Sequence, residues 1–126
     1  MRITEIKGAD MELTGAIKQY VEDKLGAIAK LTEKFEPCDV AVEVGKTTEH
    51  HRKGDVFRAE FNMTIPGTML RAEAKMDDLY AAIDTATDEL KAQVKKYKEK
   101  LQDADRVRMD ATVEEHEWSD GDGEEM

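Results

Sequence analysis

Three successive segments in the middle of the chain alternate apolar and polar residues, and a helical repeat lies on each side of them. The alternation covers residues 40–44, 57–65 and 70–76. Because successive side chains of a strand point to opposite faces, each segment predicts a strand with one buried face. Pro66-Gly67 is a tight-turn signal between the last two segments, and residues 45–54 bound a longer, basic hairpin loop.

One helix is predicted before these strands in the sequence and one after them. The first begins at Thr14, a favourable N-cap residue that follows the apolar Leu13, and its apolar residues recur at steps of three and four as far as Phe35. Pro37 is expected to end this helix, because the residue before a proline avoids the helical conformation. The second helix covers residues 77–101. Its apolar stripe consists of Leu79, Ile83, Ala86, Leu90, Val94, Tyr97 and Leu101.

The predicted order of elements is β-α-β-β-β-α, since Arg2–Lys7 is a short β-prone segment ahead of the first helix. This order indicates an α+β fold: one antiparallel-rich four-stranded sheet with both helices on its apolar face. A length of 126 residues suits a single domain of this kind.

The net charge of −10 is unevenly distributed along the chain. Residues 1–101 contain 17 Lys and Arg against 19 Asp and Glu, a net of −2, whereas residues 102–126 have a net of −8. The apolar periodicity lapses after Asp103. We therefore expect a domain over residues 1–101 and an acidic, disordered tail over residues 102–126.

The second predicted helix separates its charges by sign. All the charged residues in its first half, residues 77–89, are acidic, and Asp77 or Asp78 is expected to cap the helix. Its second half is rich in lysine, and on a helical wheel these lysines flank the apolar stripe on both sides. They are Lys91, Lys95 and Lys98 on one flank, and Lys96 and Lys100 on the other. Such a helix end complements the macrodipole, but the dipole acts over the last turn and the lysines span about three. A solvated helix end and a polyanion site both remain open.

No catalytic motif is present, and the chain is not expected to be an enzyme or to need a cofactor. No apolar run approaches the roughly 20 residues of a membrane span, and the N-terminus lacks a signal-peptide pattern. Cys38 is the only cysteine, which excludes an internal disulfide and suits a reducing compartment. A cytoplasmic location is therefore expected.

The basic hairpin loop contains His50, His51, Arg52 and Lys53. Adjacent histidines can bind metal, but they lack the helical i, i+4 spacing or cysteine partners of a zinc site, so no metal is expected. A solvated loop and an RNA-contacting loop both remain open. Arg58, Arg71 and Lys75 alternate with acids on the open sheet face, which favours a solvated face. Tyr80 and Tyr97 are aromatic residues that could stack on bases, although packing is favoured for Tyr97.

Three sequence blocks carry a resemblance to a known family. They are Glu-Leu-Thr-Gly-Ala-Ile at residues 12–17, Asp-Leu-Tyr-Ala-Ala-Ile-Asp at residues 78–84 and Val-Lys-Lys-Tyr-Lys-Glu-Lys-Leu at residues 94–101. The element order resembles the double-stranded-RNA-binding domain, except for the strand placed first. The blocks more closely resemble the ribosome hibernation-promoting factors, also called ribosome-associated translation inhibitors or sigma-54 modulation proteins. The short form, without the C-terminal dimerisation domain, is indicated.

The resemblance implies a bacterial stress-response protein, monomeric when free, that binds the small ribosomal subunit and not a membrane or a small-molecule substrate. It implies that the protein occupies the mRNA and tRNA path and keeps idle ribosomes inactive. It further implies that lysines of both helices contact rRNA phosphates, which requires charge and reach but no base code. On the first helix these are Lys18, Lys24 and Lys30, and on the second Lys91, Lys95, Lys96, Lys98 and Lys100.

The chain departs from the family pattern at Ala27, Glu89 and Ala92, where relatives commonly carry Lys or Arg. Lys24 is predicted near the apolar flank of its helix, where its charge would have to reach around to solvent. An alternative function is a protein-binding modulator, for example of a transcription factor, that acts through the acidic tail.

Overall fold

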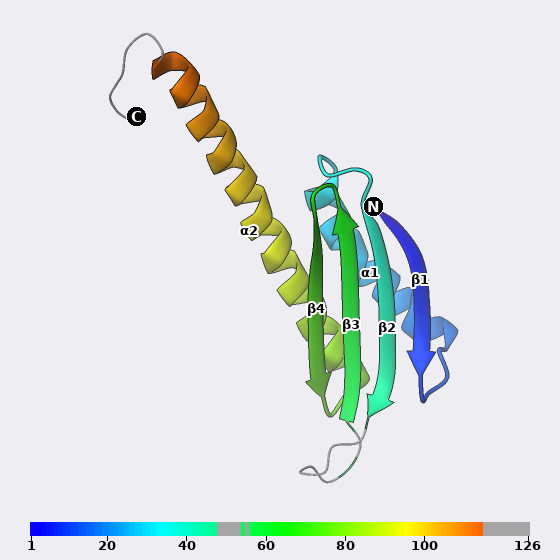
Figure 1. Cartoon of the computed structure of the whole chain (residues 1–126). Coiled ribbons are helices and arrows are strands. Elements are labelled where there is room, and N and C mark those ends of the chain that lie inside the picture. The colour runs from blue at the N-terminus through cyan, green and yellow to red at the C-terminus, as the bar shows by residue number, and fades with distance from the viewer. Residues whose placement is uncertain (48–53, 55, 115–126) are drawn as a thin grey trace. The chain divides into compact units, whose positions relative to one another are not determined.

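Four strands form one mixed sheet in the order β1-β2-β3-β4 (Figure 1). They are β1 (Arg2–Ala9), β2 (Asp39–Thr47), β3 (Val56–Ile65) and β4 (Thr68–Met76). The structure is a computed structural model that describes residues 1–47, 54 and 56–114, with side chains through residue 104. The predicted α+β class and the order β-α-β-β-β-α are confirmed.

The connections explain the directions of the strands. β1 and β2 pair in parallel because helix α1 (Gly15–Ala29) carries the chain back across the sheet between them. β2 with β3 and β3 with β4 pair antiparallel. The predicted tight turn joins the last pair, and Gly67 adopts φ +90°, a conformation that glycine tolerates and other residues rarely adopt.

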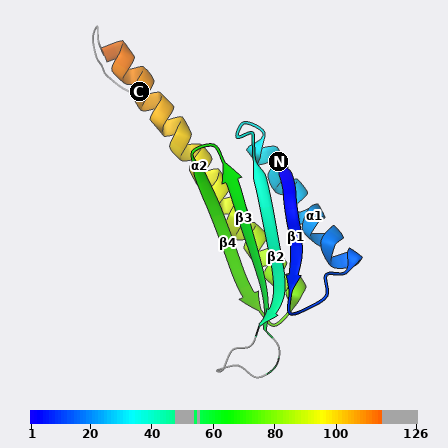
Figure 2. The ribbon, with the colours of Figure 1, turned by 45° about the vertical axis from the view of Figure 1, so that its right-hand side comes forward.

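Helix α1 and the start of helix α2 (Leu79–Glu114) lie on the same face of the sheet (Figures 1 and 2). The core forms between the sheet and the two helices, because every second side chain along a strand points toward the helices and is buried there. Strand residues Val42, Phe61 and Ala72 share one register row across three strands and are fully or almost fully buried. The helices contribute Ile17, Val21, Leu25 and Ile28 from α1, and Leu79, Ile83, Ala86, Leu90 and Val94 from α2.

Both helix starts are capped by the predicted residues. The Thr14 hydroxyl accepts a hydrogen bond from the Ile17 backbone N–H at 3.2 Å, and an Asp78 carboxylate oxygen accepts one from the Ala81 N–H at 2.9 Å. Between Asp77 and Asp78, the structure therefore selects Asp78. These caps fix where each helix leaves the preceding segment.

The helix ends differ from the predicted ones. α1 ends at Ala29 and tightens into a single 3-10 turn over Lys30–Thr32, rather than continuing to Phe35. The buried Thr32 hydroxyl donates to the Ala29 carbonyl at 3.0 Å, a contact made within this turn.

α2 continues past residue 101 as far as Glu114. Residues 102–114 contain no glycine or proline and include Ala, Arg, Gln and Met, which favour helix, so nothing in this stretch stops the helix. The segment therefore has regular backbone although its apolar periodicity lapses. The expectation of a separate acidic tail over residues 102–126 stays a prediction, and residues 115–126 lie outside the described range.

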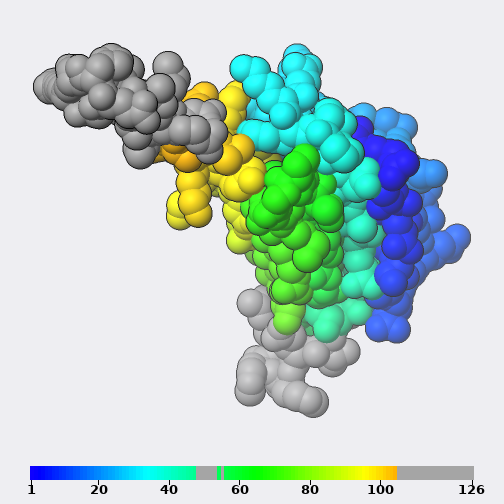
Figure 3. Space-filling view, turned by 45° about the horizontal axis from the view of Figure 1, so that its top comes forward, coloured from blue at the N-terminus to red at the C-terminus, as the bar shows by residue number. Residues whose placement is uncertain are grey.

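The chain divides into two compact units, Met1–Val94 and the part from Lys95 onward. The first unit contains the sheet, α1 and the start of α2, and the second consists, in its described part, of the remainder of α2. On the open face of the first unit the strands form one continuous surface, from β1 in blue to β4 in green (Figure 3).

The two outer strands of this sheet have local features along their edges. β1 carries an irregularity in its register between Ile3 and Glu5, and the Thr4 hydroxyl there donates to the Val40 carbonyl at 3.2 Å. On the other side, the Gln93 side-chain amide of α2 donates to the Arg71 carbonyl of β4 at 2.7 Å.

Candidate nucleic-acid interface

The lysines of α2 lie on a continuous helix, so their predicted spacing around it holds. Lys91 belongs to the first unit and is half-buried, whereas Lys95, Lys96 and Lys100 in the second unit are exposed and Lys98 is half-buried. Within the described part of the chain, none of the five forms an ion pair with a carboxylate.

The apolar stripe between these lysines becomes more exposed along the helix. Val94 is fully buried, Tyr97 is half-buried, and Leu101 is 37% exposed. Tyr97 is thus in the stripe, as predicted. Glu89 is exposed on the same helix, and its carboxylate lies 3.5 Å from the Gln93 amide. Ala92 on α2 and Ala27 on α1 are also exposed, so all three departures from the family pattern are at surface positions.

The lysines of α1 do not form a comparable group. Lys18 is exposed on α1, and Lys30, the first residue of the 3-10 turn that follows α1, is exposed as well. Lys24 is half-buried, and its Nζ lies 3.0 Å from the Asp84 carboxylate of α2 and 5.7 Å from the centre of the Tyr20 ring. The predicted position of Lys24 at the apolar flank is consistent with this half-burial. Its charge is matched internally, which sets it apart from the five lysines of α2.

Asp84 joins the two helices through a second contact that sequence reasoning missed. The Tyr20 hydroxyl donates to Asp84 Oδ1 at 2.6 Å. This hydrogen bond is the main reason that the pKa of Asp84 is lowered and the pKa of Tyr20 is raised. The hydrogen bond to Asp84 likewise raises the pKa of Lys24. Because 64 residues separate Tyr20 from Asp84, no local spacing could have indicated the contact.

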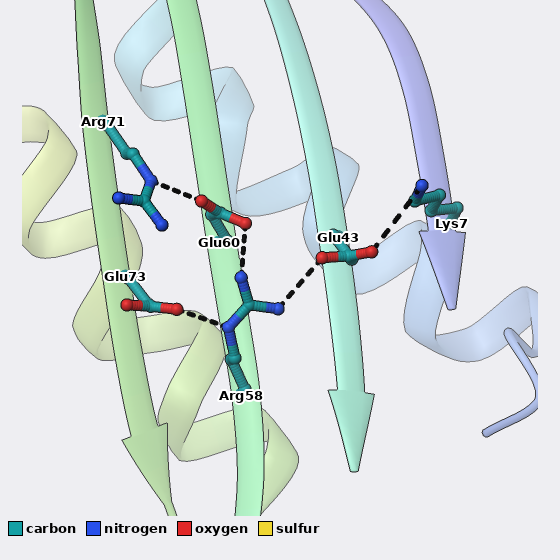
Figure 4. Close-up of polar contacts among 6 residues, drawn as sticks. All are labelled: Lys7, Glu43, Arg58, Glu60, Arg71 and Glu73. Carbon is teal, nitrogen blue, oxygen red and sulfur yellow. Dashed lines mark hydrogen bonds and ion pairs between the residues drawn. The ribbon is translucent and has the colours of Figure 1, made fainter. Parts of the chain in front are cut away.

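The open face of the sheet carries a connected network of charges (Figure 4). Glu43, Glu60 and Glu73 lie directly opposite one another on β2, β3 and β4, an arrangement that is repulsive by itself. The Arg58 guanidinium offsets this repulsion, because it donates to all three carboxylates. Arg71 donates to Glu60, and the Lys7 ammonium lies 3.7 Å from the Glu43 carboxylate.

The ion pairs of this network shift the pKa values of its members. Burial by itself would raise the pKa of Glu60, but the hydrogen bond from Arg71 and the charges of Arg58 and Arg71 lower it below its usual value. The hydrogen bonds from Arg58 to Glu43 and Glu73 raise the pKa of the guanidinium still further. The guanidinium groups of Arg58 and Arg71 are therefore paired with carboxylates of neighbouring strands.

The remaining predicted positions give no further site. His50, His51, Arg52 and Lys53 lie outside the described residues. Across the part of the chain that the structure describes, no three His, Cys, Asp or Glu side chains come together in a way that could hold a metal ion. No described helix combines the length and the apolar character needed to cross a membrane.

Curated relatives share this sequence pattern. A ribosome hibernation promotion factor of Deinococcus radiodurans is 34% identical over 98 residues, which are 78% of this chain and 50% of that protein. A ribosome hibernation promotion factor of Staphylococcus aureus is 35% identical over 109 residues, 86% of this chain and 55% of that protein. The chain spans about half the length of these relatives.

Solved structures and a family profile agree with these relatives. The N-terminal domain of Protein Y from Thermus thermophilus has a TM-score of 0.57 and 35% identity, and covers 77% of this chain and 99% of that one. A ribosomal subunit interface protein from Coxiella burnetii has a TM-score of 0.60 at 22% identity over 78% of this chain and 98% of that one, which supports the fold. Residues 4–102 match the family described as sigma 54 modulation protein / S30EA ribosomal protein. The chain therefore belongs to the sigma 54 modulation protein / S30EA ribosomal protein family.

Proposed function

We propose that this protein binds the small ribosomal subunit and inhibits translation by occupying the mRNA and tRNA path. The observation that carries the proposal is the group of five α2 lysines without a carboxylate partner among the described residues. Family membership supports it, because the relatives are named ribosome hibernation promotion factors. The protein acts sterically in this proposal, as a monomer and without catalysis or a cofactor.

The lysines of α2 suit the phosphates of rRNA. Phosphate contact requires cationic side chains with sufficient reach, and it supplies most of the affinity of proteins that do not read base edges. Of the α1 lysines, Lys18 and Lys30 are exposed and able to contribute, whereas Lys24 must first exchange Asp84 for a phosphate. The contact is assigned to residues 1–101, and the acidic segment 102–126 is not required for it.

The decisive experiment is pelleting of the protein with purified small ribosomal subunits at two salt concentrations. Replacement of Lys91, Lys95 and Lys98 by Gln should weaken binding and relieve inhibition of translation in vitro, with an unchanged circular dichroism spectrum. Each lost phosphate contact should lower the slope of log K against log salt by roughly 0.7–0.9. Glu89→Lys should have the opposite effect on binding, because it adds a cation to the same helix.

A matched control carries the same loss of charge on the strands: Lys7, Lys46 and Lys75 replaced by Gln. This variant should pellet like the wild type. Equal weakening by both triple variants would mean that only the overall charge matters. Pelleting of the α2 variant at the wild-type level in both salts would show that the α2 lysines are a solvated helix end and that the proposed contact is wrong.

A further inference from the structure

The ring of Tyr80 is exposed at the start of α2, in the first unit of the chain. The Tyr80 side chain is 38% exposed. In the described part of the chain, the other large apolar side chains that are exposed are those of Met69 and Leu101. The Tyr80 ring packs edge to face with the ring of Tyr20 at a centroid distance of 4.8 Å and an interplanar angle of 90°. Such a contact fixes the orientation of an otherwise mobile surface ring.

Tyr20 is itself held in place from two directions. Its hydroxyl donates to Asp84 at 2.6 Å, and the Lys24 ammonium lies over its ring at 5.7 Å from the centroid. Tyr20 therefore supports Tyr80 as a fixed neighbour. The exposed part of the Tyr80 ring is a preset aromatic surface, which lowers the entropic cost of binding a flat ligand.

The charges around this surface indicate which flat ligand it suits. Lys24 and Asp84 neutralise each other at 3.0 Å, and Asp88 adds a nearby negative charge that also raises the pKa of Lys24. A phosphate gains little here. The π face of an unpaired nucleobase is uncharged and stacks on tyrosine without needing a cation.

The position of Tyr80 on α2 connects it to the proposed phosphate contacts. Tyr80 and Lys91 are eleven residues apart, so they lie about 20° from each other around the helix and roughly 16 Å apart along it. A single strand of RNA that contacts Lys91 and follows this side of the helix reaches Tyr80. The two side chains thus offer one strand a phosphate contact and a stacking contact.

We propose that Tyr80 stacks on an unpaired base of the bound RNA and that Tyr20 is the residue that positions it. This inference rests on the proposed function, since it assigns a base contact to the same RNA complex. It differs from the lysine contacts in one measurable respect: stacking does not release counterions, so it contributes affinity without changing the salt slope.

The test compares Tyr80→Leu with Tyr80→Phe, which retains the ring, in pelleting with purified small ribosomal subunits at two salt concentrations. Tyr80→Leu should weaken binding about fivefold or more, which corresponds to the lower end of measured stacking contributions, with an unchanged salt slope. Tyr80→Phe should bind like the wild type. Circular dichroism and thermal melting verify that both variants fold.

A fluorescence measurement reports the stacking contact directly. Trp118→Phe removes the single tryptophan of the chain, and Tyr80→Trp then places a tryptophan at the proposed contact. Addition of small subunits should quench its emission, and Tyr20→Leu in the same background should reduce the quenching because the ring loses its support. Quenching unchanged by Tyr20→Leu would overturn the positioning role of Tyr20.

The outcomes separate this inference from the proposed function. If the wild type pellets, the α2 lysine variant does not, and Tyr80→Leu binds like the wild type, the stacking contact is wrong and the ribosome-binding function stands. Absence of quenching in a Tyr80→Trp variant that still pellets would overturn the stacking contact in the same way. If the wild type itself fails to pellet, both proposals are wrong.

Discussion

On the open face of the sheet, Arg58, Arg71 and Lys7 each lie against a neighbouring carboxylate, whereas the five lysines of α2 meet none among the described residues. Both regions are rich in charge, so a count of charged residues does not distinguish them. The difference is whether the cations are satisfied within the fold. Only cations that are not satisfied internally can bind a polyanion without first losing a partner.

The two secondary structures account for this difference. Adjacent strands lie about 4.8 Å apart, so side chains from three strands can surround one guanidinium, as Glu43, Glu60 and Glu73 surround Arg58. Along a single helix, neighbours are limited to the residues three and four positions away. Residues 90–101 of α2 hold five lysines against a single acid, Glu99, so each lysine has few neighbours of opposite charge within reach on its own helix.

The largest expected effect tests the core that carries both regions. Leu90→Ala should lower the free energy of unfolding by roughly 2–5 kcal/mol, because the Leu90 side chain on the inward face of α2 is completely buried. Leu101→Ala is the matched control on the same helix and should cost less than about 1 kcal/mol, since Leu101 is 37% exposed. Urea denaturation followed by circular dichroism measures both. Equal costs would mean that the inward face of α2 has been assigned wrongly.

A smaller effect separates stability from binding. Arg58→Gln should lower the free energy of unfolding by about 1–2 kcal/mol, because three carboxylates lose their shared partner on a partly solvated surface. Ribosome pelleting should be unchanged. The triple Gln variant of α2 should show the reverse pattern, with normal stability and weak binding. If Arg58→Gln reduces pelleting while it stays folded, the open face takes part in binding and the contrast between the two regions fails.

The smallest effect concerns pH. The pKa of Glu60 is lowered in the folded protein, so its ion pairs add stability above the unfolded-state pKa of about 4.3. That stability is lost as the pH falls through the folded-state pKa. Glu60→Gln should therefore flatten the acid limb of the stability curve by on the order of 0.5 kcal/mol. Urea titrations between pH 6 and pH 3 measure this, and parallel curves for wild type and variant would argue against it.

The sequence was sufficient for the elements and for much of the lysine geometry, because both depend on local periodicity. Alternation predicted the strands, Thr14 predicted the start of α1, and the helical wheel placed the lysines of α2 around a helix that is continuous. Contacts between distant segments were not accessible in this way. The Tyr20–Asp84 hydrogen bond depends on how α1 and α2 pack on the sheet, which no local pattern encodes.

The helix ends show the same limit. α1 ends earlier than its apolar spacing predicts, in a 3-10 turn where the buried Thr32 hydroxyl bonds to the Ala29 carbonyl, and the burial of Thr32 is not readable from the sequence. α2 ends later because the absence of helix-breaking residues outweighs the loss of apolar periodicity. What the lysines bind is also not a local property, since the same charges serve a helix dipole or a phosphate.

The hydrogen bond from Gln93 to the Arg71 carbonyl has a consequence for the protein at high concentration. An exposed outer strand offers its backbone groups to a strand of another molecule, which is a common route to aggregation. On β4 the Gln93 amide already occupies one of these carbonyls, and on β1 the irregular register at Thr4 disturbs the straight edge that an incoming strand needs. Each outer strand thus carries one local feature that disfavours pairing with an incoming strand, and we expect both to oppose polymerisation of the chain through its sheet.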